Sequence, residues 1–347
     1  MDSQARSNQR KGLLLVWAVL GVLILICFSA ILWMVHQIHA PIRMNRSVVS
    51  VTLPRGVHAR QIAVLLRQAG VNVNGHAFLL LTRFRQSSRE LKSGDYLFEE
   101  GVTLLDVLRR IEEGRCLTVK VVIPEGYRTA QIARKLAKAG VIEDEEAFMK
   151  WAGDEALARS LGVEGNGLTG FLYPDGFYFA VGLSEKDVIT IMVQRFFEVL
   201  PPDYEERANS VGMTLYDAVI LASIVEKEAV MDEEREIISG VFHNRLRKGW
   251  RLQADPCVRF ATQNFSKRLT HKHLRHDCPY NTYVYKGLPP GPICNPGIPS
   301  LMAAVNPSEV DFFFFVSMNN GRHHFSVTLE EHNKAVWRYQ IMNEVGT

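Results

Sequence analysis

The 347-residue sequence predicts an α+β protein with a single N-terminal transmembrane helix, a small βα module and a larger mixed α/β domain. Three observations predict this: a long uncharged apolar run near the N-terminus, a gapless internal repeat, and a change after Gly249 from helical periodicity to loops and short strands. The formal net charge of +3 is too small to favour a nucleic-acid partner. The chain also has neither a GxGxxG motif nor a Walker-type loop for nucleotide phosphates.

The apolar run covers residues 12–35, which is enough uncharged chain to cross a bilayer as a helix. A signal peptide has a shorter apolar region that ends in small residues, whereas this run ends in a Trp-Met pair. Three basic residues lie within positions 1–11, so the positive-inside rule places that segment in the cytoplasm. We therefore expect a single-pass protein of the cytoplasmic (inner) membrane whose bulk faces the periplasm.

The internal repeat aligns residues 51–78 with residues 121–148. Each copy predicts a short strand, a Pro-x-Gly turn, an amphipathic helix that ends near Gly70 or Gly140, and the start of a second helix. Because two copies are too few for a solenoid, we interpret them as related βα modules.

The first module continues through a turn and strand at 91–98 and a helix at 103–113, which gives a compact unit at 48–115. Residues 116–347 form the larger predicted domain. Its predicted helices and one buried strand, in chain order, lie at 128–139, 144–152, 184–199, 214–229, 233–248 and 312–318.

The predicted helix 214–229 carries a glutamate in apolar surroundings. Thr214 is a helix N-cap, and the following residues leave almost no polar face, which is typical of a buried helix. Glu226 shares a narrow stripe with Val219 and Ala222, whereas Glu228 points to nearly the opposite side. Burial raises the pKa of a carboxyl group toward the range of a general acid. We therefore predict Glu226 as the catalytic acid; the alternative is a glutamate at a helix end that reaches the surface.

Two further segments supply polar groups suited to a carbohydrate. The segment 241–258 contains Gln253 and Asp255. The segment 279–297 is rich in proline and glycine and follows Tyr280, Asn281 and Tyr283. Such a loop is stiff and extended; aromatic rings stack on sugar faces while amides bind hydroxyl and acetamido groups. These five residues are our candidates for substrate binding, with a purely structural proline loop as the alternative.

The cysteines and histidines do not predict a metal or cofactor. No CxxC motif is present, and His323, His324 and His332 lack ligand spacing, so we predict them to be structural or surface histidines. Cys116, Cys257, Cys278 and Cys294 follow the apolar run. An oxidising compartment permits a disulfide, most plausibly among the last three, and isolated buried thiols are an equal alternative.

These motifs, in this order, resemble the YceG-like family. The segments that carry the resemblance are VTLPRG and SGDYLF in the first module, then ASIVEKEA, VFHNRL, RLQADPCV, PYNTY, GLPPGPICNPG and HHFSVTLEEHN. The resemblance extends from the apolar run to near the C-terminus. It implies a LysM-like module at 48–115 and a catalytic domain at 116–347, within which 121–148 is the repeat-related βα segment. It also places the family's catalytic glutamate on Glu226, the first glutamate of IVEKE.

The resemblance further implies an endolytic lytic transglycosylase. Such an enzyme cleaves the β-1,4 bond between MurNAc and GlcNAc in nascent peptidoglycan strands without water, leaves 1,6-anhydro-MurNAc ends, and so terminates glycan elongation. It uses no cofactor, and its implied partners are glycan strands and cell-wall synthases of the penicillin-binding protein class. Two rivals stay open. One is a muramidase that admits water and uses Asp255 as second carboxylate; the other is a non-catalytic peptidoglycan-binding scaffold.

Overall fold

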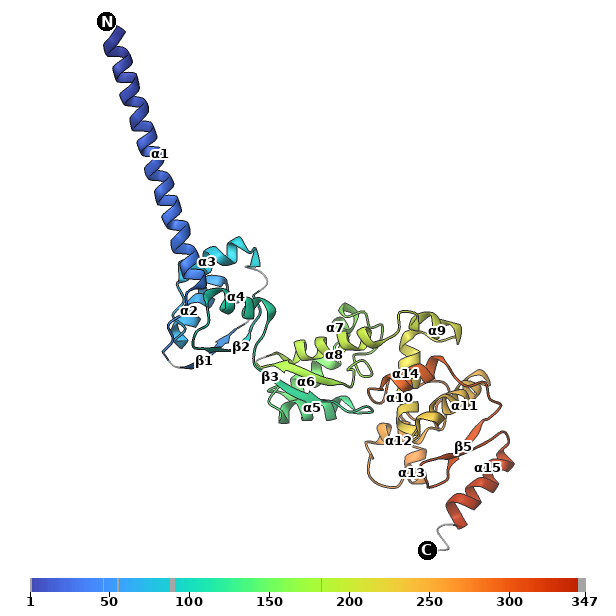
Figure 1. Cartoon of the computed structure of the whole chain (residues 1–347). Helices are drawn as coiled ribbons and strands as arrows, with labels where there is room; N and C mark the ends of the chain where they lie inside the picture. The colour runs from blue at the N-terminus through green and yellow to red at the C-terminus, as the bar shows by residue number, and fades with distance from the viewer. Residues whose placement is uncertain (1, 46, 55, 88–90, 182, 343–347) are drawn as a thin grey trace. The chain divides into compact units, whose positions relative to one another are not determined.

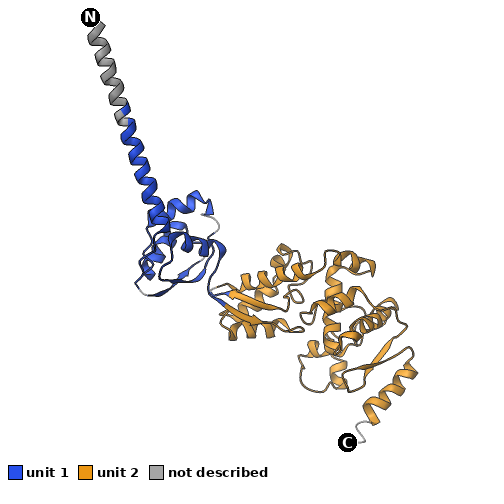
Figure 2. Ribbon diagram, viewed as in Figure 1, with its two compact units in different colours: residues 1–118, 180–182 blue, residues 119–179, 183–347 orange. Residues whose placement is uncertain are grey.

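The computed structural model describes residues 2–45, 47–54, 56–87, 91–181 and 183–342. The chain divides into two compact units, one of residues 1–118 with 180–182 and one of residues 119–179 with 183–347 (Figure 2). Each unit has its own cluster of buried apolar side chains.

The first unit begins with a long apolar helix and continues as a small βααβα fold (Figure 1). Its elements are α1 (Asp2–His39), β1 (Val48–Leu53), α2 (Ala59–Ala69), α3 (Gly75–Phe84), β2 (Gly94–Glu99) and α4 (Leu104–Glu113). β1 and β2 pair antiparallel, with Val48 opposite Glu99 and Leu53 opposite Gly94. Alternate residues of β1 are buried, as expected for a strand with one face on a core.

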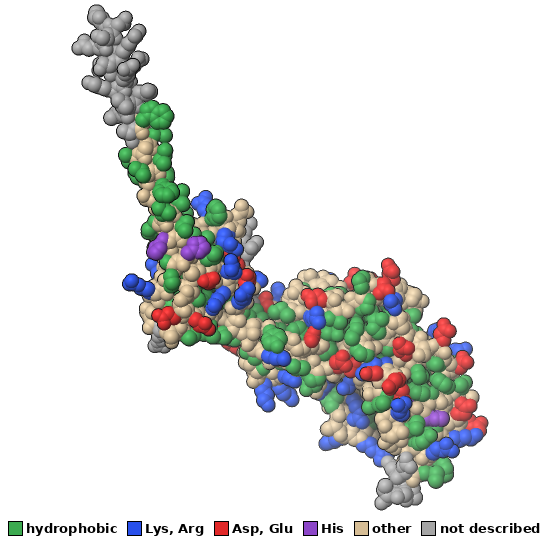
Figure 3. Space-filling view, viewed as in Figure 1, with side chains coloured by type: hydrophobic (Ala, Val, Ile, Leu, Met, Phe, Trp, Pro, Cys, Tyr) green, Lys and Arg blue, Asp and Glu red, His purple; other side chains and the backbone are tan. Residues whose placement is uncertain are grey.

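Helix α1 is long and apolar enough, over Leu20–His39, to cross a membrane. Hydrophobic side chains cover its described part (Figure 3). Near its end the helix joins the first unit: Met34 and Ile38 pack against the buried cluster of that unit. Just beyond it, the backbone N–H of Ile42 donates to the carbonyl of Val102 at 2.8 Å. The last turns of α1 therefore pack against the core of the first unit.

The second unit is larger and mostly helical. Its elements are β3 (Thr118–Val122), α5 (Thr129–Lys138), α6 (Glu145–Ala152), α7 (Glu155–Ser160), β4 (Gly176–Ala180), α8 (Glu185–Val199), α9 (Tyr204–Ser210), α10 (Leu215–Glu228), the 3-10 helix η2 (Asp232–Glu234), α11 (Arg235–Arg247), α12 (Asp255–Thr262), α13 (His271–Leu274), α14 (Ile298–Val305), β5 (Phe314–Ser317), β6 (His323–Ser326), α15 (Leu329–Val336) and the π-helix η3 (Trp337–Ile341). β3 pairs with β4, and β5 pairs antiparallel with β6.

The internal repeat forms equivalent structures in the two units. β1, α2 and α3 correspond in order to β3, α5 and α6, each of which is one or two residues shorter. Both copies begin the first helix in the same way: the backbone N–H groups of His58 and Arg128 each donate to the side-chain oxygen of the glutamine three residues later, at 3.0 and 3.1 Å. This half of a capping box satisfies a backbone donor near the start of the helix. The predicted helices of the repeat are thus confirmed.

Helix α10 is the centre of the second unit. Thr214 caps it by accepting from the backbone N–H of Asp217 at 3.1 Å, as the sequence predicts. Residues 218–225 are all buried, and α10 packs between α14 and α11. Burial ends at the last turn, which delivers Glu226 and Glu228 to the edge of the core. The predicted helix 233–248 is confirmed, except that its first turn is the 3-10 helix η2.

Candidate functional site

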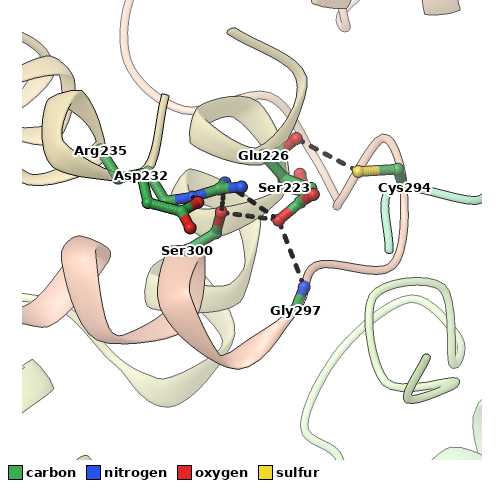
Figure 4. Close-up of polar contacts among 7 residues, drawn as sticks. All are labelled: Ser223, Glu226, Asp232, Arg235, Cys294, Gly297 and Ser300. Atoms are coloured by element: carbon green, nitrogen blue, oxygen red, sulfur yellow. Dashed lines mark hydrogen bonds and ion pairs between the residues drawn. The ribbon is translucent and has the colours of Figure 1, made fainter. Parts of the chain in front are cut away.

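Glu226 is buried in a polar network at the end of α10 (Figure 4). Its side chain is 7% exposed, and one carboxylate oxygen, Oε2, accepts from three groups. Ser300 Oγ donates to it at 2.6 Å, the backbone N–H of Gly297 at 3.3 Å, and Arg235 Nη1 at 3.3 Å. Arg235 also pairs with Asp232, at 3.0 Å between Nε and Oδ1. These are the contacts that a carboxylate anion accepts, and they satisfy the buried charge of Arg235.

A second carboxyl group, that of Glu125, lies beside this network. Burial, and then the charge of Glu226, raises the pKa of Glu125. Gly297 makes room for it, because a side chain at position 297 would overlap the Glu125 carboxylate. Glu125 is itself exposed, so this side of the Glu226 network lies at the surface.

Glu228 has different surroundings, because it lines two cavities of about 460 Å³ each. We call the first the strand-side cavity; its lining comprises Glu228, Arg245, Gln253, Asp255, Tyr283, Phe314, Phe315, Val316, Ser317, His323, Leu329, His332 and Gln340. We call the second the helix-side cavity; its lining comprises Arg128, Gln131, Lys227, Glu228, Asp255, Pro256, Arg259, Phe260, Phe265 and Ile293. Glu228 and Asp255 line both, so these two carboxyl groups lie where the cavities meet.

Burial raises the pKa of Glu228 to about 8, and the charge of Asp255 adds to this rise. The charges of Arg245 and Arg259 lower the pKa of Glu228, but by less than burial and Asp255 raise it. Glu228 is therefore protonated at neutral pH, which is the state that a general acid needs.

Three of the five predicted substrate-binding residues gather around Glu228. Gln253, Asp255 and Tyr283 line the strand-side cavity with it. Tyr283 Oη donates to Asp255 Oδ1 at 2.8 Å, and the backbone N–H of Gln253 donates to the carbonyl of Thr282 at 3.1 Å. Gln253 has a positive φ of 48°, a strained conformation for a residue with a side chain, and such strain often marks functional positions.

The other two predicted residues, Tyr280 and Asn281, are outside both linings. The Asn281 side chain is fully buried, where it donates to the carbonyls of His276 and Leu274 at 2.8 and 3.2 Å. Tyr280 packs on Phe260, with ring centroids 4.8 Å apart. The Asn281 amide thus shapes the loop that carries Tyr283, and its contact with a sugar stays a prediction.

Arg245 and His323 line the strand-side cavity too, although the sequence did not indicate them as site residues. Arg245 Nε donates to the carbonyl of Phe313 at 2.7 Å and its guanidinium lies 5.5 Å from the centre of the Phe314 ring. His323 Nδ1 contacts Glu234 Oε2 at 2.7 Å, and both side chains are buried. This pairing agrees with the prediction of a structural histidine, and it also orients a ring that lines the cavity. Both contacts link residues distant in sequence, so no local pattern indicates them.

The proline-rich loop, residues 279–297, is hydrogen-bonded to α10 and to the aromatic segment around Gly170. Asn295 accepts from the backbone N–H groups of Gly170 and Leu172 at 2.8 and 3.1 Å, and donates to the carbonyl of Tyr127 at 2.9 Å. The backbone N–H of Ile293 donates to Ser223 Oγ at 3.0 Å. These contacts make the loop a rigid wall near the end of α10.

The cysteines are all free thiols in this structure, so the disulfide alternative is not realised here. Burial raises the pKa values of Cys257 and Cys294, and the thiol of Cys294 donates to the carbonyl of Ser223 at 3.3 Å. Within the described part of the chain, no three His, Cys, Asp or Glu side chains are arranged to hold a metal ion.

Comparisons with known proteins agree with the motifs. The model of the YceG-like family matches residues 51–338. A Bacillus subtilis (strain 168) protein named endolytic murein transglycosylase is 29% identical over 311 residues, which cover 85% of this chain and 86% of that protein. A protein of the same name from Streptococcus pneumoniae (strain D39) is 26% identical over 328 residues, 85% of this chain and 59% of that protein. The crystal structure of a yceG-like protein from Listeria monocytogenes superposes with a TM-score of 0.57 at 30% identity, covering 83% of this chain and 98% of that chain.

Proposed function

The chain belongs to the YceG-like family, and from this premise we propose that it is an endolytic lytic transglycosylase that acts on peptidoglycan. The observation that carries the proposal is the position of Glu228, a carboxyl group with a pKa of about 8 where two cavities meet. The names of the relatives from Bacillus and Streptococcus supply the substrate class.

In the proposed reaction, the carboxyl group of Glu228 donates its proton to the oxygen that links MurNAc C1 to GlcNAc, and the C1–O bond breaks with oxocarbenium-like character. The Glu228 carboxylate then accepts the proton of the MurNAc C6 hydroxyl, whose oxygen forms a bond to C1. The products are a 1,6-anhydro-MurNAc end and a free GlcNAc hydroxyl. Because the nucleophile is part of the substrate, one carboxyl group is sufficient.

We assign the acid to Glu228, although the sequence favoured Glu226. Glu226 Oε2 accepts hydrogen bonds from Arg235, Ser300 and Gly297, and Glu226 is not among the residues that line the two cavities. Gln253, Asp255 and Tyr283, which we predicted to bind substrate, lie in the lining that contains Glu228. Glu226 stays the alternative acid, and the experiment below separates the two.

The muramidase rival is favoured by one observation, the presence of Asp255 in both cavity linings with Glu228. A hydrolase of the inverting or retaining type needs such a second carboxylate. Tyr283 Oη occupies one oxygen of Asp255 at 2.8 Å, which suits a residue that orients groups in the site. The products distinguish the two reactions, because hydrolysis leaves reducing MurNAc ends.

The decisive experiment is mass spectrometry of uncrosslinked peptidoglycan strands treated with the purified chain, its Glu228→Gln variant or its Glu226→Gln variant. We expect anhydro ends from the wild type, their loss with Glu228→Gln, and their persistence with folded Glu226→Gln. Reducing ends would favour the muramidase. Persistence of anhydro ends with Glu228→Gln and their loss with folded Glu226→Gln would return the role to Glu226. Strand binding without any cleavage by the wild type would favour the scaffold.

We further propose that α1 spans the cytoplasmic membrane with residues 1–11 in the cytoplasm, so that the enzyme cuts nascent strands and terminates their elongation beside cell-wall synthases. The apolar window Leu20–His39 supports the span. The β1–α2–α3–β2 order with antiparallel strands supports a LysM-like first unit. Protease added to spheroplasts tests the orientation: it should remove the second unit and spare a tag at the N-terminus.

A further inference from the structure

The two cavities at Glu228 differ in charge. The helix-side cavity has three cationic side chains, Arg128, Lys227 and Arg259, whereas the strand-side cavity has one, Arg245. The carboxyl groups of Glu228 and Asp255 belong to both linings, so they do not alter the difference of two positive charges. The histidines of the strand-side cavity do not remove it: His323 pairs with Glu234, and burial lowers the pKa of His332, which keeps that ring neutral.

Among the described residues, none of the three cations forms an ion pair, although ion pairs occur elsewhere in the second unit. The Arg128 guanidinium lies 3.4 Å from the centre of the Phe265 ring, and its Nε donates to Gln131 at 3.2 Å. Stacking and this hydrogen bond hold the guanidinium plane in place, as in sites that bind carboxylates.

From this difference we infer that the helix-side cavity binds the peptide-bearing MurNAc, through carboxylates of its stem peptide, and that the strand-side cavity binds GlcNAc. The inference rests on the proposed function. The two sugars that flank the cleaved bond differ in charge: GlcNAc is neutral, whereas MurNAc carries a lactyl group from which a peptide with free carboxylates extends. A cationic cavity next to the acid therefore fixes the direction of the strand, and the new anhydro end forms on the helix side.

A consequence is selectivity for strands that still carry peptides. Removing the peptides removes the anionic partner of Arg128 and Lys227, so peptide-free strands should be poorer substrates. Arg259 also holds the segment that follows α12, because its Nη1 donates to the carbonyl of Lys267 at 2.9 Å. We therefore leave Arg259 out of the test. Lys227 is exposed, so its substitution should leave the fold intact.

The test compares the full chain with Arg128→Gln, Lys227→Gln, the double variant and Lys248→Gln, all purified in detergent. Lys248 is exposed and lies outside both linings, so Lys248→Gln is a control that removes one positive charge. Each protein receives uncrosslinked strands with peptides and the same strands after amidase treatment. The readout is the ratio of kcat/KM for peptide-bearing to peptide-free strands, from anhydro ends counted by mass spectrometry.

We expect a ratio well above one for the wild type and for Lys248→Gln. It should fall about threefold in each single variant and about tenfold in the double variant, as for exposed charge pairs that act together. A wild-type ratio of one would overturn the inference. So would an unchanged ratio in the double variant, including the case in which kcat/KM falls equally on both kinds of strand. In those cases anhydro ends would still form, so these results would not contradict the proposed function. Absence of anhydro ends from the wild type would instead refute the proposed function, and the inference with it.

Discussion

Glu226 and Glu228 lie two positions apart on α10, and their carboxyl groups have different surroundings. One is enclosed by Arg235, Ser300 and a backbone N–H group; the other lines two cavities. A helix turns by about 100° per residue, so such neighbours can serve separate purposes. At this scale we propose Glu228 as the catalytic acid, with Glu226 as the alternative.

Substituting Glu228 by Gln should lower the rate of strand cleavage by at least about 100-fold, because the amide cannot donate the proton of a carboxylic acid. In the wild type, kcat/KM should fall as pH rises through about 8, where Glu228 loses its proton. A pH profile of anhydro-end formation checks this. A profile that stays flat from pH 7 to pH 10 would contradict the assignment.

The same group predicts how stability depends on pH. In the unfolded chain a glutamate ionises near its ordinary pKa of 4.5, whereas folded Glu228 keeps its proton up to about pH 8. Its contribution to stability is therefore fully present below about pH 4.5 and is lost as pH rises through 8. Glu228→Gln lacks this loss, so at pH 9 its free energy of unfolding should exceed that of the wild type by on the order of 2–4 kcal/mol. Urea unfolding at pH 5 and pH 9 measures it; equal pH dependence in both proteins would contradict it.

Substituting Glu226 by Gln should destabilise the fold. Arg235 would lose its buried partner and keep only the contacts with Ser300 and the exposed Asp232. We expect a loss of about 1–3 kcal/mol in the free energy of unfolding, less than for a fully orphaned buried charge. Denaturant unfolding at pH 7 measures this, with Glu206→Gln, at an exposed position of α9, as the matched control. An unchanged midpoint would show that the network contributes little to stability.

At the scale of elements, the predicted helices are confirmed because their signals are local: periodic apolar residues, caps at Thr214 and glycines such as Gly70 at helix ends. The predicted buried strand at 312–318 is found as the shorter strand β5, whose residues are only half-buried. The site could be predicted only in part. Gln253, Asp255 and Tyr283 are indicated by composition, but their position beside Glu228 depends on contacts between distant segments, such as Gln253 with Thr282. The apolar stripe of α10 indicates only which residues are buried, and it does not show which of them line a cavity. It therefore favoured Glu226, whose side chain is indeed buried.

The loop that contains Asn295 offers a test at the same scale. Asn295→Ala would remove one acceptor of two backbone N–H groups and one donor to Tyr127, all between segments far apart in sequence. We expect a loss of about 2–4 kcal/mol in the free energy of unfolding, because the groups left behind are buried. Asn333→Ala, at an exposed position of α15, is the control and should change little. Similar midpoints for the two variants would contradict this role.

At the scale of the whole chain, the two units have separate apolar cores, and the end of α1 packs against the first of them. Removing residues 2–32 should leave the first unit as stable as in the full chain. Removing residues 2–40 also removes Met34 and Ile38 from its core, and should destabilise that unit by about 1–3 kcal/mol. Thermal unfolding in detergent measures the difference, with the protease sensitivity of the β1–β2 region as the signal for unfolding of the first unit. Equal stability of the two truncated chains would show that α1 contributes nothing beyond anchoring.

The continuity of α1 with the first core also has a geometric consequence for an enzyme held in a bilayer. A hinge at the bilayer surface would let the first unit swing through a wide volume, but a helix whose last turns are packed into that unit cannot provide one. Under the proposed membrane span, the first unit would be confined to a thin layer directly above the lipid, and its search for a glycan would be lateral diffusion within that layer. Strands emerging at the bilayer surface would then meet the protein far more often than mature wall farther out.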